Sequence, residues 1–260
     1  RPEAIKMAPV VKTLEKVLDV TVCVTAQHRE MLDQVLDLFE ITPDYDLDIM
    51  KPGQDLFDVT SNVLHGMRRV LQEVKPDVVL VQGDTTTSMA TSLASFYLQI
   101  PIGHVEAGLR TYDIYSPFPE EVNRQVTSRV TKLHFAPTEQ AKRNLLAEQV
   151  ADSDIIVTGN TVIDALMTVV EKSRQVEFPD EILSSLSFLT DKVIPRIVLI
   201  TGHRRENFGQ GFKEICQALS DLSGMHTNVQ FVYPVHLNPN VREPVNRVLM
   251  GVENIHLVEP

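Results

Sequence analysis

Acidic side chains stand at the ends of two apolar runs and at the start of the helix expected next. Asp84 comes shortly after the apolar run 78–81, and Glu106 closes the following run. Glu120 and Glu121 fall in the first turn of the next expected helix. In open α/β sheets, ligands bind in the crevice outside the carboxyl ends of the strands. The sequence therefore predicts that carboxylates from three elements converge on one ligand-binding crevice.

The two strand-end carboxylates also have structural explanations. Asp84 precedes an expected helix, and Asp is a preferred N-cap residue. Glu106 directly follows a buried strand, where a carboxylate is costly unless it is paired or exposed in a site. The structural alternative for Glu106 is an ion pair with Arg110 or Arg124. We favour a functional role for Glu106, whereas both explanations stay open for Asp84.

The two adjacent glutamates differ in direction. Acidic residues in a first turn are favoured by the helix dipole, which explains both without any function. Successive residues of a helix are turned by about 100° from each other. At most one of Glu120 and Glu121 therefore needs to face the crevice, and position alone favours the structural explanation for Glu120.

Basic residues at other strand ends could bind an anion. His203, Arg204 and Arg205 follow the first strand of an expected second domain. Guanidinium groups suit phosphate, and a histidine can donate a proton. Arg1, at a first βα turn, and Lys6, one helical turn further on, are similar candidates. The alternative for the His-Arg-Arg segment is a solvated run of charges.

Two further polar residues follow strands. His236 lies past a strand end with Arg242 close by, and Asn160 follows Thr158 and Gly159 as either a cap or a residue lining an interdomain face. Neither a Gly-x-Gly-x-x-Gly segment nor a phosphate-binding loop of ATPases occurs in the sequence. Clustered Cys and His residues with metal-ligand spacing are also missing from it. We therefore expect no cofactor and no metal.

Composition limits the class of protein. The 260 residues carry a net charge of −11 and an isoelectric point near 5.2, which argues against a general nucleic-acid binder. Cys23 and Cys216 lie far apart and are expected to be buried thiols in a reducing compartment. No apolar run approaches the roughly 18 residues of a membrane span, and no signal peptide is visible. The expectation is a cytoplasmic enzyme.

Strands and helices alternate along the chain. Apolar, β-branched runs predict strands, and amphipathic segments predict helices between them. The expected strands are 20–24, 78–82, 101–105, 133–136, 155–157, 197–201, 229–233 and 255–258. The expected helices start at 2, 27, 54, 86, 119, 138, 161, 211 and 241, with a loop over 41–53. Pro9 should kink or interrupt the first helix.

This alternation predicts an α/β fold with parallel sheets covered on both faces. The pattern breaks up around 173–195, so we expect one Rossmann-like domain over 1–172 and a second, nucleotide-binding one over 173–260. The second series has only about three strands, and half a sheet would leave an edge and an apolar face uncovered. The chain therefore looks cut short at its carboxyl end, and at its start too.

Several segments together resemble one family, the bacterial non-hydrolysing UDP-N-acetylglucosamine 2-epimerases. The resemblance covers the whole length in the order of the family. It rests on the segments Arg1–Pro9, Gln27–Arg29, Gly83–Thr87, Gly103–Arg110, Ser116–Glu121, Thr158–Thr161, Gly202–Glu206 and Tyr233–Pro239. The family also has a first strand with Phe-Gly-Thr before Arg1, and a later Asp-Ser-Gly-Gly motif that contacts UDP. Neither is present here.

The resemblance implies two doubly wound Rossmann-like domains facing across a cleft, as in GT-B glycosyltransferases, and a homodimer. It implies reversible interconversion of UDP-N-acetylglucosamine and UDP-N-acetylmannosamine without a nicotinamide cofactor, for bacterial surface polysaccharide. UDP and the C2 hydrogen would leave together to give a 2-acetamidoglucal. UDP would then add back while a proton reaches the opposite face of C2. Such a route needs acid–base groups on both faces and a cationic seat for the diphosphate.

The resemblance also assigns roles to residues. Catalysis would fall on Asp84, Glu106, Glu120 and His203, with Glu106 as the proton-transferring group at C2. Substrate binding would fall on Arg1, Lys6, Arg124, Asn160 and Arg204. Activation by UDP-N-acetylglucosamine bound beside the active site would involve Gln27, His28 and His236. The alternatives are a hydrolysing epimerase, a GT-B glycosyltransferase and a nucleotide-sugar binding domain.

Overall fold

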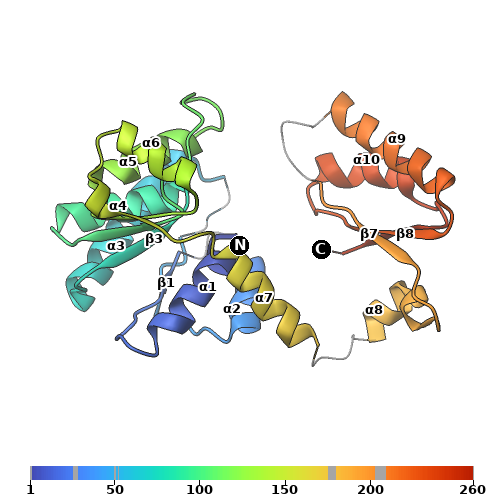
Figure 1. Cartoon of the computed structure of the whole chain (residues 1–260), viewed down its shortest axis with the longest axis horizontal. Coiled ribbons are helices and arrows are strands. Elements are labelled where there is room, and N and C mark those ends of the chain that lie inside the picture. Colours follow the sequence, from blue (N-terminus) through green and yellow to red (C-terminus); the bar gives the residue numbers. More distant parts are fainter. Residues whose placement is uncertain are drawn as a thin grey trace. The chain divides into compact units, whose positions relative to one another are not determined.

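The computed structural model describes residues 2–25, 29–49, 51, 53–174, 180–202 and 209–259. The chain divides into two compact units, residues 1–174 and 175–260, and each is described by itself (Figure 1). Both are built from parallel strands joined by helices. The α/β class predicted from the sequence is confirmed.

The first unit centres on a four-stranded parallel sheet. Its strands β3 (Val79–Gln82), β4 (Ile102–Val105), β5 (Leu133–Ala136) and β6 (Ile155–Val157) lie side by side in chain order. Strand β4 is buried along its length. Because every neighbouring pair is parallel, all four carboxyl ends meet at one edge of the sheet. That edge receives Asp84 and Glu106.

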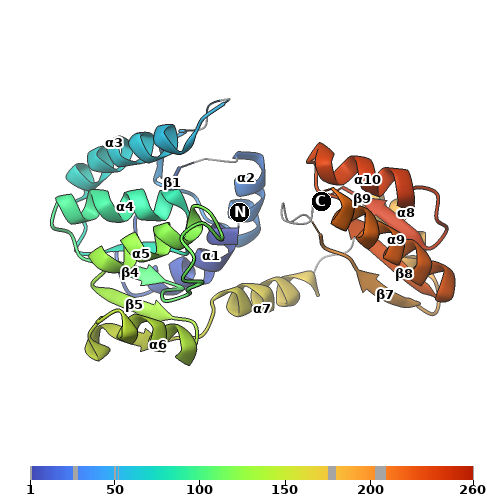
Figure 2. The ribbon, with the colours of Figure 1, turned by 90° about the horizontal axis from the view of Figure 1, so that it is seen from above.

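Helices connect these strands, as parallel pairing requires. The connections contain α4 (Thr86–Tyr97), α5 (Glu120–Val130) and α6 (Glu139–Ala147). The long α3 (Leu56–Val74) packs on α4, and α4 packs on α5; Figure 2 shows the three in this order. Side-chain caps define the starts of α3, α4 and α6, including a reciprocal capping box between Asp55 and Asp58 on α3.

A smaller layer completes the first unit. It contains α1 (Pro2–Leu14), α2 (Arg29–Phe39), α7 (Val162–Ser173) and the short parallel pair β1 (Cys23–Val24) and β2 (Tyr45–Asp46). Helix α1 packs on α2 and α7 around a common apolar core. Two expectations differ from the structure here. Pro9 does not interrupt α1, although a kink at Pro9 stays a prediction, and the expected loop over 41–53 contains strand β2.

The second unit has a three-stranded parallel sheet. Strands β7 (Arg196–Leu199), β8 (Val229–Pro234) and β9 (Ile255–Val258) lie in chain order. Helices α9 (Gln210–Met225) and α10 (Pro239–Leu249) pack on each other and on the sheet, around a core that includes Phe212, Tyr233 and Leu249. The short α8 (Asp180–Ser185) precedes β7. In the described ranges of both units, every helix is too short or too polar to cross a membrane.

Candidate active site

The carboxyl ends of β3 and β4 turn sharply at the same edge of the sheet. Gly83 after β3 has φ +72°, and Gly108 after β4 has φ +88°. Glu106 has φ +67°, a left-handed conformation that is uncommon for a residue with a side chain. Strained backbone of this kind persists only where its surroundings fix it, and it gathers at active sites. Other non-glycine residues, such as Lys75 and Gln99, also have a positive φ, so the contacts of the Glu106 side chain decide whether this edge is a site.

Four hydrogen bonds fix the Glu106 carboxylate. The Lys6 ammonium donates to both oxygens at 2.7 Å, the Gln82 amide to Oε2 at 2.6 Å, and the Asn160 amide to Oε1 at 2.9 Å. The predicted structural partners, Arg110 and Arg124, were wrong. Glu106 pairs with Lys6 on α1, which the sequence places 100 residues away. Both Lys6 and Asn160, predicted to bind substrate, thus meet at Glu106.

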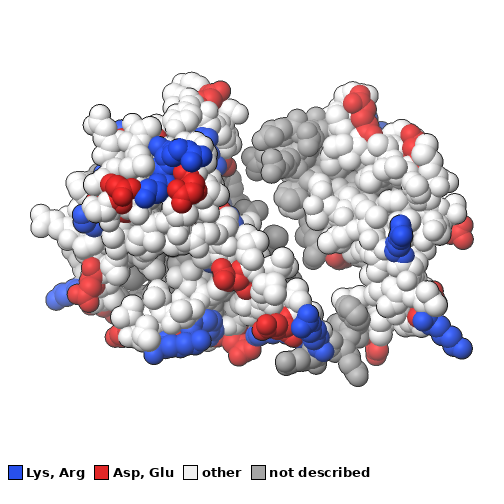
Figure 3. Space-filling model, viewed as in Figure 1, with Lys and Arg blue, Asp and Glu red and all other residues white. Residues whose placement is uncertain are grey.

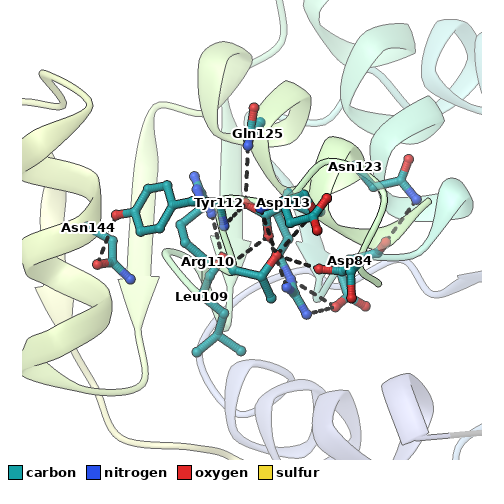
Figure 4. A network of polar contacts seen from close by, with 12 residues as sticks. Asp84, Leu109, Arg110, Tyr112, Asp113, Asn123, Gln125 and Asn144 are labelled. Atoms are coloured by element: carbon teal, nitrogen blue, oxygen red, sulfur yellow. Dashed lines mark hydrogen bonds and ion pairs between the residues drawn. The ribbon is translucent and has the colours of Figure 1, made fainter. Parts of the chain in front are cut away.

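Asp84 lies on the next turn and pairs with α5. Arg124 donates from Nε at 3.0 Å and from Nη2 at 2.6 Å to Oδ2 of Asp84. The Asn123 amide donates to the Asp84 carbonyl oxygen at 2.9 Å (Figure 4). The capping explanation for Asp84 was wrong, because the N-cap of α4 is Thr85, whose hydroxyl accepts from the Ser88 N–H. The Asp84 side chain keeps 30% of its surface exposed, so a ligand could reach it.

The two glutamates of α5 have different surroundings. Glu121 is fully buried, and the Thr111 and Tyr112 N–H groups donate to its carboxylate at 3.0 and 3.2 Å. Burial would raise its pKa, but hydrogen bonds from Thr111, Gln125, Arg124 and Tyr112 hold the pKa below its ordinary value. Glu120 is partly exposed, but its Oε2 is buried and has no hydrogen-bond partner among the described residues. The two side chains thus differ in burial, and which of them faces a ligand stays a prediction.

Helix α6 fixes the loop between β4 and α5 from the other side. The Asn144 amide donates to the Gly108 carbonyl, and the Tyr112 hydroxyl donates to Asn144 Oδ1 at 3.1 Å (Figure 4). Arg110 forms a two-point ion pair with Glu148 at 2.6 and 2.9 Å. The backbone that carries Glu106 is thus anchored at several points, which preorganises the carboxylate.

His104, on β4, contacts the turn that carries Asp84. Its Nε2 lies 2.7 Å from the Gly83 carbonyl oxygen, which can only accept, so Nε2 carries the hydrogen. Burial lowers the pKa of this imidazole to about 4. His104 and Gln82 were not among the predicted site residues. Both are polar residues in or at the end of an apolar run, and that placement was the available signal.

Some of the predicted site residues lie outside the described residues or belong to the second unit. Arg1, Gln27, His28, His203 and Arg204 lie outside the described residues. His236 belongs to the second unit, where its Nδ1 accepts from the Asn238 N–H at 3.1 Å, just before α10. Asp84, Glu106 and Glu120 come from adjacent elements at one sheet edge.

Charged side chains of both signs occur on the surface. Figure 3 shows acidic and basic side chains interspersed on one face of the molecule. Within the described ranges, no group of three or more His, Cys, Asp and Glu residues has the arrangement of a metal site. A set of carboxylates gathers at the sheet edge: Glu106 pairs with Lys6, and Asp84 and Glu121 pair with Arg124. Such a set can move protons.

Comparison with known proteins identifies the family. The sequence model of the UDP-N-acetylglucosamine 2-epimerase family matches residues 12–260. The chain belongs to this family. The UDP-N-acetylglucosamine 2-epimerase of Escherichia coli K12 is 59% identical over 264 residues, which cover all of this chain and 69% of the relative. The relative from Neisseria meningitidis serogroup A is 54% identical over 262 residues, covering 100% of this chain and 70% of the relative.

Solved structures of the family agree with the fold. The Neisseria meningitidis epimerase bound to UDP-GlcNAc is 53% identical with a TM-score of 0.92, covering 100% of this chain and 70% of that one. The Methanocaldococcus jannaschii epimerase in complex with UDP-GlcNAc and UDP is 31% identical, with a TM-score of 0.80 and coverage of 100% and 71%. The family resemblance drawn from the sequence motifs is therefore confirmed.

Proposed function

We propose that this protein interconverts UDP-N-acetylglucosamine and UDP-N-acetylmannosamine without net hydrolysis. Its family membership supports the 2-epimerisation of a UDP-linked sugar. Relatives of known structure bind UDP-GlcNAc and UDP, which supports the same ligands here. The protein would thus be an isomerase that uses no nicotinamide cofactor.

The chemistry explains why several carboxylates are useful. The hydrogen at sugar C2 is not next to a carbonyl and is only weakly acidic. Eliminating it together with UDP gives a 2-acetamidoglucal and avoids a free carbanion. UDP then adds back to C1 while a proton arrives on the opposite face of C2. Proton transfer on two faces needs two positioned acid–base groups.

The observation that carries the proposal is the cluster at Glu106. A strained, 11% exposed carboxylate is fixed by Lys6, Gln82 and Asn160, and it lies beside the turn that presents Asp84. Each Glu106 oxygen already accepts two hydrogen bonds. Glu106 can therefore take the hydrogen from sugar C2 only when the bound substrate displaces one of these hydrogen-bond donors. Lys6 is the donor best suited to move, since its side chain remains 22% exposed. A shift of Lys6 towards the departing diphosphate would free Glu106 for the proton.

Asp84 and Glu120 complete the proposed proton chemistry. Glu120 is partly exposed, but its Oε2 is buried and has no hydrogen-bond partner in the described part of the chain, so substrate would have to supply that partner. Asp84 is presented by a rigid turn and is partly exposed. The two carboxylates would support Glu106 or exchange roles with it on the other face of C2.

Other roles remain proposals that follow from the family resemblance. His203, with Arg1 and Arg204, would contact the diphosphate, and Arg124 would help to bind substrate. Gln27, His28 and His236 would bind a second UDP-N-acetylglucosamine as activator. A homodimer is the proposed assembly, and sedimentation of the full-length protein would test it.

The deciding experiment is proton NMR of UDP-N-acetylglucosamine in D2O with the full-length protein. We expect deuterium at C2 and the appearance of UDP-N-acetylmannosamine. Deuterated free N-acetylmannosamine with UDP would instead establish the hydrolysing route. A folded protein that binds UDP but exchanges no C2 hydrogen would refute epimerisation.

Glu106→Gln tests the assigned base in the same assay. The amide cannot take up the proton, so we expect turnover to fall by about 10²- to 10⁴-fold. Glu139→Gln is the matched control, because Glu139 is an exposed glutamate in the first turn of α6. Normal turnover by Glu106→Gln would remove Glu106 from the chemistry.

A further inference from the structure

Glu121 is a fully buried carboxylate that the proposed chemistry does not use. Burying a charge is costly unless hydrogen bonds and an ion pair compensate it. Here four groups do so: the N–H groups of Thr111 and Tyr112, the Gln125 amide at 3.1 Å and Arg124 Nη1 at 3.2 Å. These donors come from two different elements, the loop after β4 and helix α5.

Arg124 connects Glu121 with Asp84. One guanidinium uses Nη1 for Glu121, while Nε and Nη2 bind Asp84 (Figure 4). The planar fork of arginine fixes the relative directions of these nitrogens. The position of the Arg124 plane, and with it the Asp84 carboxylate, therefore depends on where Glu121 lies.

We infer that Glu121 is a positioning residue that sets the orientation of the Asp84 carboxylate through Arg124. The inference rests on the proposed function, because Asp84 must take part in the reaction for its orientation to matter. Glu121 itself is too deeply buried to touch substrate. Its second task is to fix the loop at Thr111 and Tyr112, which ties the segment after Glu106 to the same helix.

The arrangement also explains why two adjacent glutamates stand at the start of α5. Glu120 is partly exposed, although its partner-free Oε2 is buried, whereas Glu121 is fully buried and binds Arg124 one helical turn on. Helix geometry places positions three apart on neighbouring faces, which makes this ion pair possible. The first turn of α5 thus carries one group for substrate and one group for positioning.

Double-mutant cycles on the full-length protein test the inference. Glu121→Gln keeps the shape of the side chain but removes its charge and one acceptor. We expect kcat to fall by about 10- to 100-fold, as for a small misplacement of a reacting group, with little change in KM. In an Asp84→Asn background, Glu121→Gln should lower kcat by less than about threefold, because both substitutions act on the same Asp84 carboxylate. C2 deuteration is sensitive enough to follow these slow variants.

Two controls separate positioning from a general structural role. Gln125→Ala removes a donor to Glu121 without touching Arg124, and its kcat should stay normal. A parallel cycle pairs Glu121→Gln with Glu120→Gln, which should be close to additive because Arg124 does not join these residues. Equal coupling of Glu121 to Glu120 and to Asp84 would overturn the specific route through Arg124.

Circular dichroism and urea unfolding check that each variant is folded. If Glu121→Gln does not fold, Glu121→Asp replaces it, since the shorter carboxylate retains its charge but retreats from Arg124. Failure of both to fold would assign Glu121 to the fold alone and overturn the inference. A wild-type protein without epimerisation would refute the proposed function. Wild-type turnover with additive Glu121 and Asp84 effects would refute only the positioning role.

Discussion

Replacing Gly108 by alanine should destabilise the first unit through two separable effects. Gly108 has φ +88°, and a left-handed conformation costs an L-residue roughly 1–2 kcal/mol. An added β-carbon would also collide with the Ala141 carbonyl of α6 and lie 3.0 Å from the Leu145 side chain. Overpacking a tight interior typically costs about 1–3 kcal/mol. The expected loss of unfolding free energy is therefore about 2–5 kcal/mol.

Gly159→Ala is the matched control for this prediction. Gly159 belongs to the same unit and has φ +79°, but nothing lies within 4 Å of an added β-carbon. The Gly159→Ala variant should lose only the unfolding free energy that comes from the left-handed backbone, roughly 1–2 kcal/mol. Urea unfolding followed by circular dichroism measures both variants. Equal destabilisation of the two would show that α6 does not press on Gly108, and would refute the steric part of the reasoning.

Three further predictions concern individual side chains. Lys6→Met should lower kcat by about 10²-fold or more, because the Glu106 carboxylate loses the ammonium group paired with it. Lys6→Arg should retain part of the activity, and unchanged kinetics of Lys6→Met would contradict a role for Lys6 in the reaction. Burial lowers the pKa of His104 and of His134 to about 4, below their unfolded value of about 6.5. The unfolded chain then binds more protons, so stability should fall as pH drops from about 6.5 towards 4, by up to about 1.4 kcal/mol per pH unit for each; identical urea midpoints at neutral and mildly acidic pH would refute it. Burial and the nearby Asp46 raise the pKa of Cys23 to about 11. A thiol reagent at neutral pH should therefore label Cys23 slowly in the folded protein and quickly once urea unfolds it. Rapid labelling of the folded protein would contradict this prediction.

Much of the fold follows from local patterns in the sequence. The strands of the four-stranded sheet are short apolar runs, and turn or capping residues mark their ends. Strand β2 was missed because Tyr45 and Asp46 form a two-residue pairing with β1 that leaves no periodic signal. Helix α1 continues through Pro9 because packing on α2 and α7 outweighs the lost backbone hydrogen bond. Tertiary contacts decided both cases.

The position of the candidate site could be predicted from the sequence, but the hydrogen-bond and ion-pair partners of its residues could not. Strand ends indicated where Asp84 and Glu106 would lie, because parallel topology brings such ends to one edge. The partners of Glu106 lie on α1, on β3 and before α7, and nothing local links them to it. Glu121 could not be distinguished from Glu120 by type or position, since only the packing of α5 decides which of them faces inward.

The long sequence distances around Glu106 bear on how the protein acquires its activity. Its partners lie 24, 54 and 100 residues away along the chain. Contacts of this kind form late in folding, because long loops must close first. During synthesis at about 5–20 residues per second, Asn160 follows Glu106 by roughly 3–10 s. A nascent chain therefore carries Asp84 and Glu106, which follow β3 and β4, before the contacts that fix the Glu106 carboxylate can form. If Glu106 acts as proposed, epimerase activity should appear only after the first unit has folded.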